Sequence, residues 1–279
     1  MAKPDIFDEI ISYLKRNSQM GNDRTTISPE LCQHFFTDIP RAQVQQPVQQ
    51  QNSQQQNSQW QQTSQPAVQQ QSSTQMMAAM AQAAPPQQLA PVPDLSQNDL
   101  ITLKQTAISC TSCPLHEHRT NVVFGDGNPN AELMFIDEIP GYHEDMQGIP
   151  AVGDAGNLLT KMISAMQYSR TDVYITNIVK CRPPNSRNPQ PAEAACYLTY
   201  LNRQIELIQP KVIVLFGPVP LKSLLNLNGI KAHRGQWLEY RGIPVIATFS
   251  PAYLLRFQAA KGDTWHDLQM VMKKLRITN

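Results

Sequence analysis

The chain has 279 residues, and its 23 Lys and Arg against 22 Asp and Glu give a formal net charge of +1 at pH 7. This charge assigns no class of partner, although residues 96–279 carry 18 Lys and Arg against 15 Asp and Glu, a small excess that favours a polyanion. No apolar run approaches the roughly 18 residues of a membrane span, and the N-terminus lacks the apolar region of a signal peptide. We therefore expect a soluble, cytoplasmic protein without a membrane partner.

A tract rich in Gln divides the chain. No charged residue lies between Arg41 and Asp94, and Gln with Ser, Asn and Pro makes up most of residues 43–75. Such a tract cannot bury enough apolar surface to offset the entropy lost on ordering. The sequence therefore predicts a small helical module over residues 1–40, a disordered linker over 41–95 and a globular domain over 96–279.

The N-terminal module shows helical patterning. Apolar residues from Ile6 to Leu14 recur on one helical face, and Ser28 followed by Pro29 is typical of the start of a second helix. Two such helices are too small to make much of a core. We expect them to dock on another surface, with packing of the two helices on each other as the alternative, and Cys32 as a lone buried thiol.

Residues 96–279 alternate apolar strand segments with helical segments. We expect helices over about 97–108, 156–166, 193–208, 220–225 and 264–275, and strands over 131–136, 173–177, 211–217 and 243–249. Residues 137–153, which are rich in Gly and Pro, are expected to form a loop. The alternation predicts an α/β fold, a three-layer αβα sandwich around a central, mainly parallel sheet.

The strand that begins at Val173 leads into residues that can carry chemistry. Asn177 ends a β-branched and aromatic run, and Cys181 precedes a double proline that cannot continue a strand. In open α/β sheets, ligands bind at the carboxyl ends of the strands. We therefore expect the functional site near Asn177, with Cys181 anchoring the loop beside it.

Four of the five cysteines lie in this domain, at positions 110, 113, 181 and 196. In a reducing compartment disulfides are rare. A Cys-x-x-Cys pair with two further thiols on other segments indicates a metal site instead. The spacing suits both zinc and a [4Fe–4S] cluster, and four unrelated buried thiols are the remaining alternative.

A series of short motifs runs through the domain. They are Cys110-x-x-Cys113-x-Leu115, Asp137-Glu-Ile-Pro-Gly141, Glu144-Asp145, Gly148-Ile-Pro-Ala-Val-Gly153, Gly156-Asn-Leu-Leu159, Asn177-Ile-Val-Lys-Cys-Arg-Pro-Pro184, Gly217 and Ser250-Pro-Ala-Tyr-Leu-Leu-Arg256. Their order resembles that of the family 4 (iron–sulfur) uracil-DNA glycosylases, over about residues 97–276. The resemblance implies a glycosylase-like fold, DNA as the partner, and a structural [4Fe–4S] cluster held by Cys110, Cys113, Cys181 and Cys196.

Members of this family cut the N-glycosidic bond between uracil and deoxyribose after the nucleotide is flipped out of the stack. By the resemblance, Glu138 is the carboxylate of the water and sugar chemistry, and Asn177 reads the edge of the base. The segment from Ser250 corresponds to the loop that enters the minor groove and stabilises the leaving group. The resemblance thus gives Glu138, Glu144 and Ser250 as candidate catalytic residues, and Asn177, Ala151, Gly141 and Arg256 as candidate substrate-binding residues.

The chain departs from this family at several motif positions, among them Ser186, where an asparagine is usual and Asn185 stands one place early. Ser250 stands where a histidine is usual, and Ala151 stands where an aromatic side chain would stack on uracil. Asp137 replaces the usual opening glycine, and Ile139 replaces a small residue. Loss of one anion-stabilising donor costs roughly 3 kcal/mol, and loss of base stacking about 1–3 kcal/mol. The departures therefore predict weakened activity, or a preference for a related damaged base.

Two functions follow from these motifs. The first is a monomeric, nucleoid-associated DNA glycosylase of base-excision repair, with a possible protein partner for residues 1–40. The second is a catalytically inactive iron–sulfur relative that binds DNA and acts by recruiting partners.

The remaining charged, glycine and tryptophan residues near the motifs have simpler interpretations. Glycines at 153 and 156 either admit a phosphate to backbone N–H groups or allow tight packing. Trp237 and Trp265 are expected in the core. Phosphate contacts that read no sequence are expected from Lys180, Arg182, Arg187 and Arg256.

Overall fold

The structure is a computed structural model, and it describes residues 5–19 and 94–278. Its sheet has six strands in the order β1-β3-β2-β4-β6-β5, in which β3, β2, β4 and β6 are parallel. The edge strands β1 and β5 pair antiparallel with β3 and β6. The predicted α/β fold with a mainly parallel sheet is confirmed. The strands are β1 (Asp126–Gly127), β2 (Leu133–Asp137), β3 (Tyr174–Asn177), β4 (Val212–Phe216), β5 (Trp237–Tyr240) and β6 (Ile243–Thr248).

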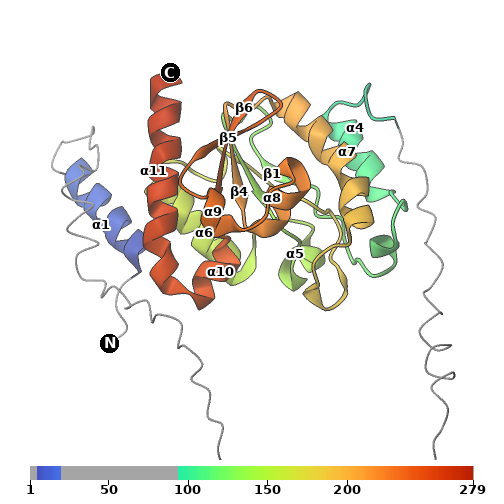
Figure 1. The fold of residues 1–279 in the computed structure, drawn as a ribbon, viewed down its shortest axis with the longest axis horizontal. Helices are drawn as coiled ribbons and strands as arrows, with labels where there is room; N and C mark the ends of the chain where they lie inside the picture. Colours follow the sequence, from blue (N-terminus) through green and yellow to red (C-terminus); the bar gives the residue numbers. More distant parts are fainter. Residues whose placement is uncertain (1–4, 20–93, 279) are drawn as a thin grey trace, which may run out of the picture. The chain divides into compact units, whose positions relative to one another are not determined.

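Helices cover both faces of the sheet (Figure 1). We call the side packed by α4, α7 and α8 the α7 face, and the side packed by α6, α10 and α11 the α6 face. Both faces are needed because the central strands are apolar along their whole length, as in Val212–Phe216, where every residue is buried. The helices of the domain are α4 (Leu100–Ile108), α5 (Tyr142–Gln147), α6 (Gly153–Ala165), α7 (Pro191–Ile208), α8 (Pro218–Leu225), α9 (Ile230–His233), α10 (Pro251–Arg256) and α11 (Lys261–Thr278).

Two helices occupy segments expected to be loops. The six-residue helix α5 begins after Gly141, where the Glu144 side chain accepts the Gly141 N–H in a capping box. The helix α10 begins after Ser250, whose side chain accepts the N–H of Tyr253. The core assignment of Trp237 is wrong, because it lies on edge strand β5 and is 37% exposed, whereas Trp265 is fully buried.

The N-terminal helix α1 (Ile6–Gln19) confirms the helix expected there and packs on the same domain. Phe7 is fully buried and meets the ring of Trp265 edge-on, with ring centroids 6.1 Å apart. The Asp8 carboxylate accepts a hydrogen bond from Lys161 Nζ at 2.7 Å, on α6. The surface on which the apolar face of α1 docks is therefore the domain of its own chain. The second helix at Ser28, Cys32 and the Gln-rich tract lie outside the described residues.

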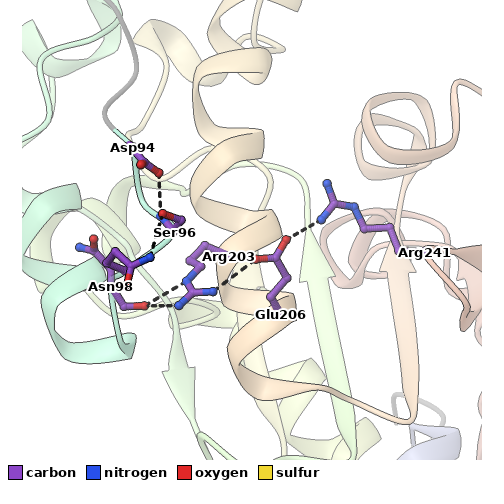
Figure 2. Close-up of polar contacts among 7 residues, drawn as sticks. Asp94, Ser96, Asn98, Arg203, Glu206 and Arg241 are labelled. Atoms are coloured by element: carbon purple, nitrogen blue, oxygen red, sulfur yellow. Dashed lines mark hydrogen bonds and ion pairs between the residues drawn. The ribbon is translucent and has the colours of Figure 1, made fainter.

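A short segment that starts at Asp94 is anchored to α7 (Figure 2). The Arg203 guanidinium, on α7, donates to the Asn98 carbonyl from Nε at 3.0 Å and Nη2 at 2.8 Å. Glu206 accepts from Arg203 and, at 2.7 Å, from Arg241 in the turn before β6. A cavity of about 410 Å³ lies beside this network, at the amino ends of β4 and β6. Ligands of parallel sheets bind at the opposite ends of the strands.

None of the helices described is both long and apolar enough to cross a membrane.

Candidate functional site

The carboxyl ends of the parallel strands bring several motif residues together. Asp137, the last residue of β2, is in register with Asn177, the last residue of β3. Phe135 and Ile175, two positions earlier, both belong to the α6-face core, so Asp137 and Asn177 continue that face. The loops that follow these strands, with α5 and α10, lie at the same end of the sheet (Figure 1). This end is the candidate site.

Asn177 has the least satisfied side chain at the site. The residue is only 3% exposed, and its Oδ1 is buried without a hydrogen-bond partner among the described residues. Its backbone carbonyl accepts a hydrogen bond from Lys180 Nζ at 2.9 Å, which fixes the strand end. Buried polar atoms are normally paired, so an unpartnered acceptor here is available to a ligand.

Asp137 places a carboxyl group beside Asn177. Its Oδ1 accepts the backbone N–H of Glu138 at 2.8 Å. Burial, together with the negative charges of Glu138 and Glu144, raises the pKa of Asp137 to about 7. The sequence marks this position only as a departure from the family motif and does not predict its place beside Asn177.

Glu138 turns from Asp137 toward the start of α8. Its Oε1 accepts the N–H of Val219 at 3.3 Å, and burial raises its pKa, an effect that Val219 and Arg256 oppose. A β-carbon at Gly217 would stand 2.6 Å from the Glu138 carboxyl, so only glycine fits there at its φ of +83°. Glu138 is therefore a partly shielded carboxylate at the strand end.

Glu144 braces the loop that closes the site. Its Oε2 accepts the N–H of Gly141 at 3.0 Å, and its Oε1 accepts the N–H of Val152 at 2.9 Å. Ala151, one residue earlier, has a φ of +50°, and its carbonyl accepts a hydrogen bond from Arg170 at 3.0 Å. Both carboxylate oxygens of Glu144 are thus occupied by the loop backbone.

Tight packing also fixes the loop that carries Ala151. A β-carbon at Gly156 would stand 1.9 Å from the Ala151 carbonyl oxygen. Of the two interpretations of this glycine, the geometry supports close packing.

Ser250 caps α10 and is 4% exposed. Its Oγ accepts the Tyr253 N–H at 3.3 Å, which leaves the hydroxyl proton free to be donated elsewhere. The rings of Phe249, Tyr253 and Phe257 stack in series, with centroids 5.0 and 4.6 Å apart. This series leads from the core to Phe257, which is half exposed.

The four basic side chains expected at DNA phosphates differ in their surroundings. The expectation is wrong for Lys180, which is fully buried on the α7 face and donates to Thr176 Oγ1, the Asn177 carbonyl and Gln204 Oε1. Burial holds its pKa well below the usual value. Long side chains with partners distant in sequence cannot be recognised from periodicity.

The other three basic side chains lie nearer the surface. Arg187 is committed to a two-point ion pair with Glu193, each contact 2.7 Å long, at the start of α7. Arg182 is half-buried and lies over the ring of Tyr142, 5.4 Å from its centroid. Arg256 is exposed at the end of α10. Arg256 and Arg182 are therefore the better placed to meet a phosphate.

All four cysteines of the domain are buried on the α7 face, and none forms a disulfide. Arg119 Nη1 donates to Cys181 Sγ at 3.2 Å and to the Cys110 carbonyl at 2.9 Å. The Tyr197 hydroxyl lies 3.4 Å from Cys113 Sγ. Sequence reasoning found the cysteines but missed Arg119 and Tyr197, for which no motif offers a signal.

The surroundings of these sulfurs favour the protonated thiols as long as no metal group is bound. The Tyr200 hydroxyl is buried without a hydrogen-bond partner among the described residues, and burial with the neighbouring Cys110 thiol raises its pKa. Burial also raises the pKa of Cys113, Cys181 and Cys196, so a bound metal group must displace their protons. Within residues 5–19 and 94–278, no three His, Cys, Asp or Glu side chains converge closely enough to hold one metal ion.

Comparison with known proteins finds matches over this domain. A model of the uracil DNA glycosylase superfamily matches residues 124–269. A type-4 uracil-DNA glycosylase of Thermotoga maritima is 46% identical over 152 residues, which cover 53% of this chain and 78% of the relative. A type-4 enzyme of Pyrobaculum aerophilum is 40% identical over 181 residues, covering 62% and 92%. A third, from Saccharolobus solfataricus, is 51% identical over 156 residues, covering 52% and 72%.

Proposed function

The chain belongs to the uracil-DNA glycosylase superfamily, in its type-4 branch, and from that membership we propose that it hydrolyses the bond between uracil and deoxyribose in DNA. The reaction is the first step of base-excision repair. The alternative of an inactive DNA-binding relative is not favoured, because relatives at 40–51% identity carry glycosylase names.

The observation that carries the proposal is the unpartnered Oδ1 of Asn177 at the end of β3. Uracil presents an N3–H donor beside a carbonyl acceptor. A carboxamide offers the complementary acceptor and donor on one rigid group. A uracil flipped into the site would pair its N3–H with Oδ1 and its O4 with the Asn177 amide N–H. Binding of uracil would thus give the buried Asn177 Oδ1 the hydrogen bond that it lacks in the free protein.

Bond cleavage is assigned to the groups that surround this base position. The C1′–N1 bond breaks, a water oxygen bonds to C1′, and the water proton passes to the Glu138 carboxylate while uracil leaves as an anion. The raised pKa of Glu138 suits a group that accepts this proton. The free proton of Ser250 is the candidate donor to the leaving base, in place of the family histidine. Gly141 and Glu144 hold the loop that carries Ala151 over the base.

The four cysteines are proposed to hold a [4Fe–4S] cluster. Zinc needs four sulfurs within about 2.3 Å of one point, whereas the sulfurs of a four-iron cluster are spread more widely. The resemblance of the motifs to the iron–sulfur uracil-DNA glycosylases is what favours the cluster over zinc. When bound, the cluster supplies a rigid tie between residues 110–113, the loop after β3 and α7. Arg119 and Tyr197 are placed to donate to its ligands.

DNA is the proposed partner, and Arg256 and Arg182 the proposed phosphate contacts. A genomic substrate would place the protein with the nucleoid, acting as a monomer. Although α1 packs on the domain, residues 1–40 as a whole are still proposed to have a protein partner.

The test is single-turnover release of base from single- and double-stranded oligonucleotides with one uracil. We expect release by the parent protein and a loss of about 10- to 100-fold for Asn177→Ala, because a buried hydrogen bond to the base is removed. The matched control is Asn130→Ala, an exposed asparagine before β2, which should match the parent. Glu138→Ala should abolish release, and Ser250→His should raise it. A parent that binds DNA but releases no uracil would contradict the proposal.

A further inference from the structure

Asp137 and Asn177 form a pair of neighbouring polar side chains at the end of the sheet. They are in register on adjacent parallel strands, which lie about 4.8 Å apart. Their side chains continue the α6 face beyond Phe135 and Ile175. A planar base that pairs with the Asn177 amide therefore comes within reach of the Asp137 carboxyl.

The Asp137 carboxyl has one oxygen to spare. Its Oδ1 is held by the Glu138 N–H at 2.8 Å, whereas its Oδ2 has no hydrogen-bond partner within residues 5–19 and 94–278. The amide of Asn177 has an unpartnered Oδ1 as well. Two adjacent side chains thus each present an uncommitted oxygen at the same end of the sheet.

We propose that Asp137 is a specificity-determining residue, which in its neutral form donates a hydrogen bond to a carbonyl oxygen of the flipped base beside Asn177. The inference rests on the proposed function and adds to it the protonation state in which the base is accepted. A neutral carboxyl offers a donor to uracil, whose N3–H lies between two carbonyl groups. The same donor opposes cytosine, which carries an amino group in place of one carbonyl. An ionised Asp137 would instead repel the negative charge that grows on the leaving uracil.

The charged surroundings of Asp137 favour the neutral form. The negative groups that act on it are Glu138, at its own strand end, and Glu144, on α5. Its β3 neighbour is the neutral Asn177, and the next strand, β4, ends in Phe216. Among the described residues, no cation contributes to its ionisation. Burial and these two carboxylates raise the pKa of Asp137 to about 7, which places the change of state between pH 6 and 8.5.

The inference predicts that uracil release is favoured by acid. If only the neutral form is competent, the single-turnover rate follows the protonated fraction and falls about 30-fold from pH 6 to pH 8.5. An Asp137→Asn variant keeps an acceptor for the Glu138 N–H and presents an amide donor at every pH. Its rate should therefore be flat across this range. Asp137→Gly removes the group altogether and should also be flat, at a lower rate than the parent shows at pH 6.

The experiment uses the full-length, cluster-loaded protein in saturating excess over a single-stranded, end-labelled oligonucleotide with one uracil, followed by alkaline cleavage of the product. The matched control is Asp172→Asn, a carboxylate in an exposed turn before β3, at the other end of the strand. It should keep the parent's pH profile. A fall for the parent and for Asp172→Asn, with flat profiles for Asp137→Asn and Asp137→Gly, supports the inference.

Two outcomes overturn it, and they are distinct. If the parent is active and its pH profile matches that of Asp137→Asn, Asp137 does not have the proposed role, and the glycosylase assignment still stands. A parent that releases no uracil at any pH overturns the proposed function, and the inference with it.

Discussion

The two faces of the sheet treat their buried polar groups differently. On the α7 face, Lys180 makes three hydrogen bonds and Arg119 links a cysteine sulfur to two backbone carbonyls. On the α6 face, the buried Asp267 carboxylate accepts hydrogen bonds from Thr248 and Arg234, but at the strand ends Asn177 keeps an unpartnered oxygen and the half-buried Asp137 lies near other carboxylates. The exception on the α7 face is the Tyr200 hydroxyl, which adjoins the cysteines. Groups that hold the fold are satisfied, and groups left open lie where a ligand is expected.

The largest effect is expected on the α7 face, from removal of a cysteine. Cys181→Ser should lose iron and the broad absorbance near 400 nm, and the apparent Tm should fall sharply, because the loop after β3 loses its tie to two other segments. Iron analysis, absorbance and thermal unfolding of anaerobically purified protein measure this. Cys32→Ser is the matched control and should behave as the parent. A colourless parent with stoichiometric zinc would contradict the cluster.

A smaller loss is expected for the buried lysine. Lys180→Met should lower the free energy of unfolding by about 3 kcal/mol, because Thr176, Gln204 and the Asn177 carbonyl lose a donor. The salt dependence of DNA binding should not change, since a buried side chain contacts no phosphate. The control is Lys222→Met, an exposed lysine on α8, with an effect within about 0.5 kcal/mol. A weaker salt dependence of DNA binding by Lys180→Met would show that Lys180 contacts a phosphate after all.

The smallest effect concerns the α6 face and depends on pH. The pKa of Asp137 is about 7 in the folded protein and near 3.8 in the unfolded chain. Between these values the folded state binds the extra proton, so stability falls as pH rises and the loss is complete above pH 7. Asp137→Asn escapes this loss. The free energy of unfolding of Asp137→Asn, taken relative to that of the parent, should therefore increase by about 2 kcal/mol from pH 5.5 to pH 8. Thermal or urea unfolding at both pH values measures this. A stability difference between variant and parent that stays the same at every pH would show that folding does not change the pKa of Asp137.

The sequence allowed the layers and most elements to be predicted. Apolar runs such as Val212–Phe216 are buried throughout, and periodicity is strong enough to identify them. The helices α5 and α10 escaped because each depends on one capping side chain, Glu144 or Ser250, within a segment rich in turn residues. Edge strand β5 escaped because its alternate residues remain exposed, which also misplaced Trp237.

The candidate site was predicted less evenly than the fold. Asn177 and the four cysteines could be proposed from the sequence because a strand end and a thiol spacing are local signals. Lys180 was misassigned because its partner Gln204 lies on another element, α7. The pairing of Asp137 with Asn177 depends on strand register, which no local signal of either segment reveals. Contacts between elements are therefore what the sequence could not supply.

The alternation of side chains along β3 has a consequence for how this enzyme can diverge. Thr176 points to the cysteine side and Asn177 to the base side, so the two chemistries share a backbone but no side chain. The departures at Asp137, Ala151 and Ser250 lie on the α6 face or its loops, whereas the departure at Ile139 packs against the core of the α7 face. Mutational drift or laboratory selection for a new base preference can therefore explore these positions while the half that carries the four cysteines is inherited unchanged.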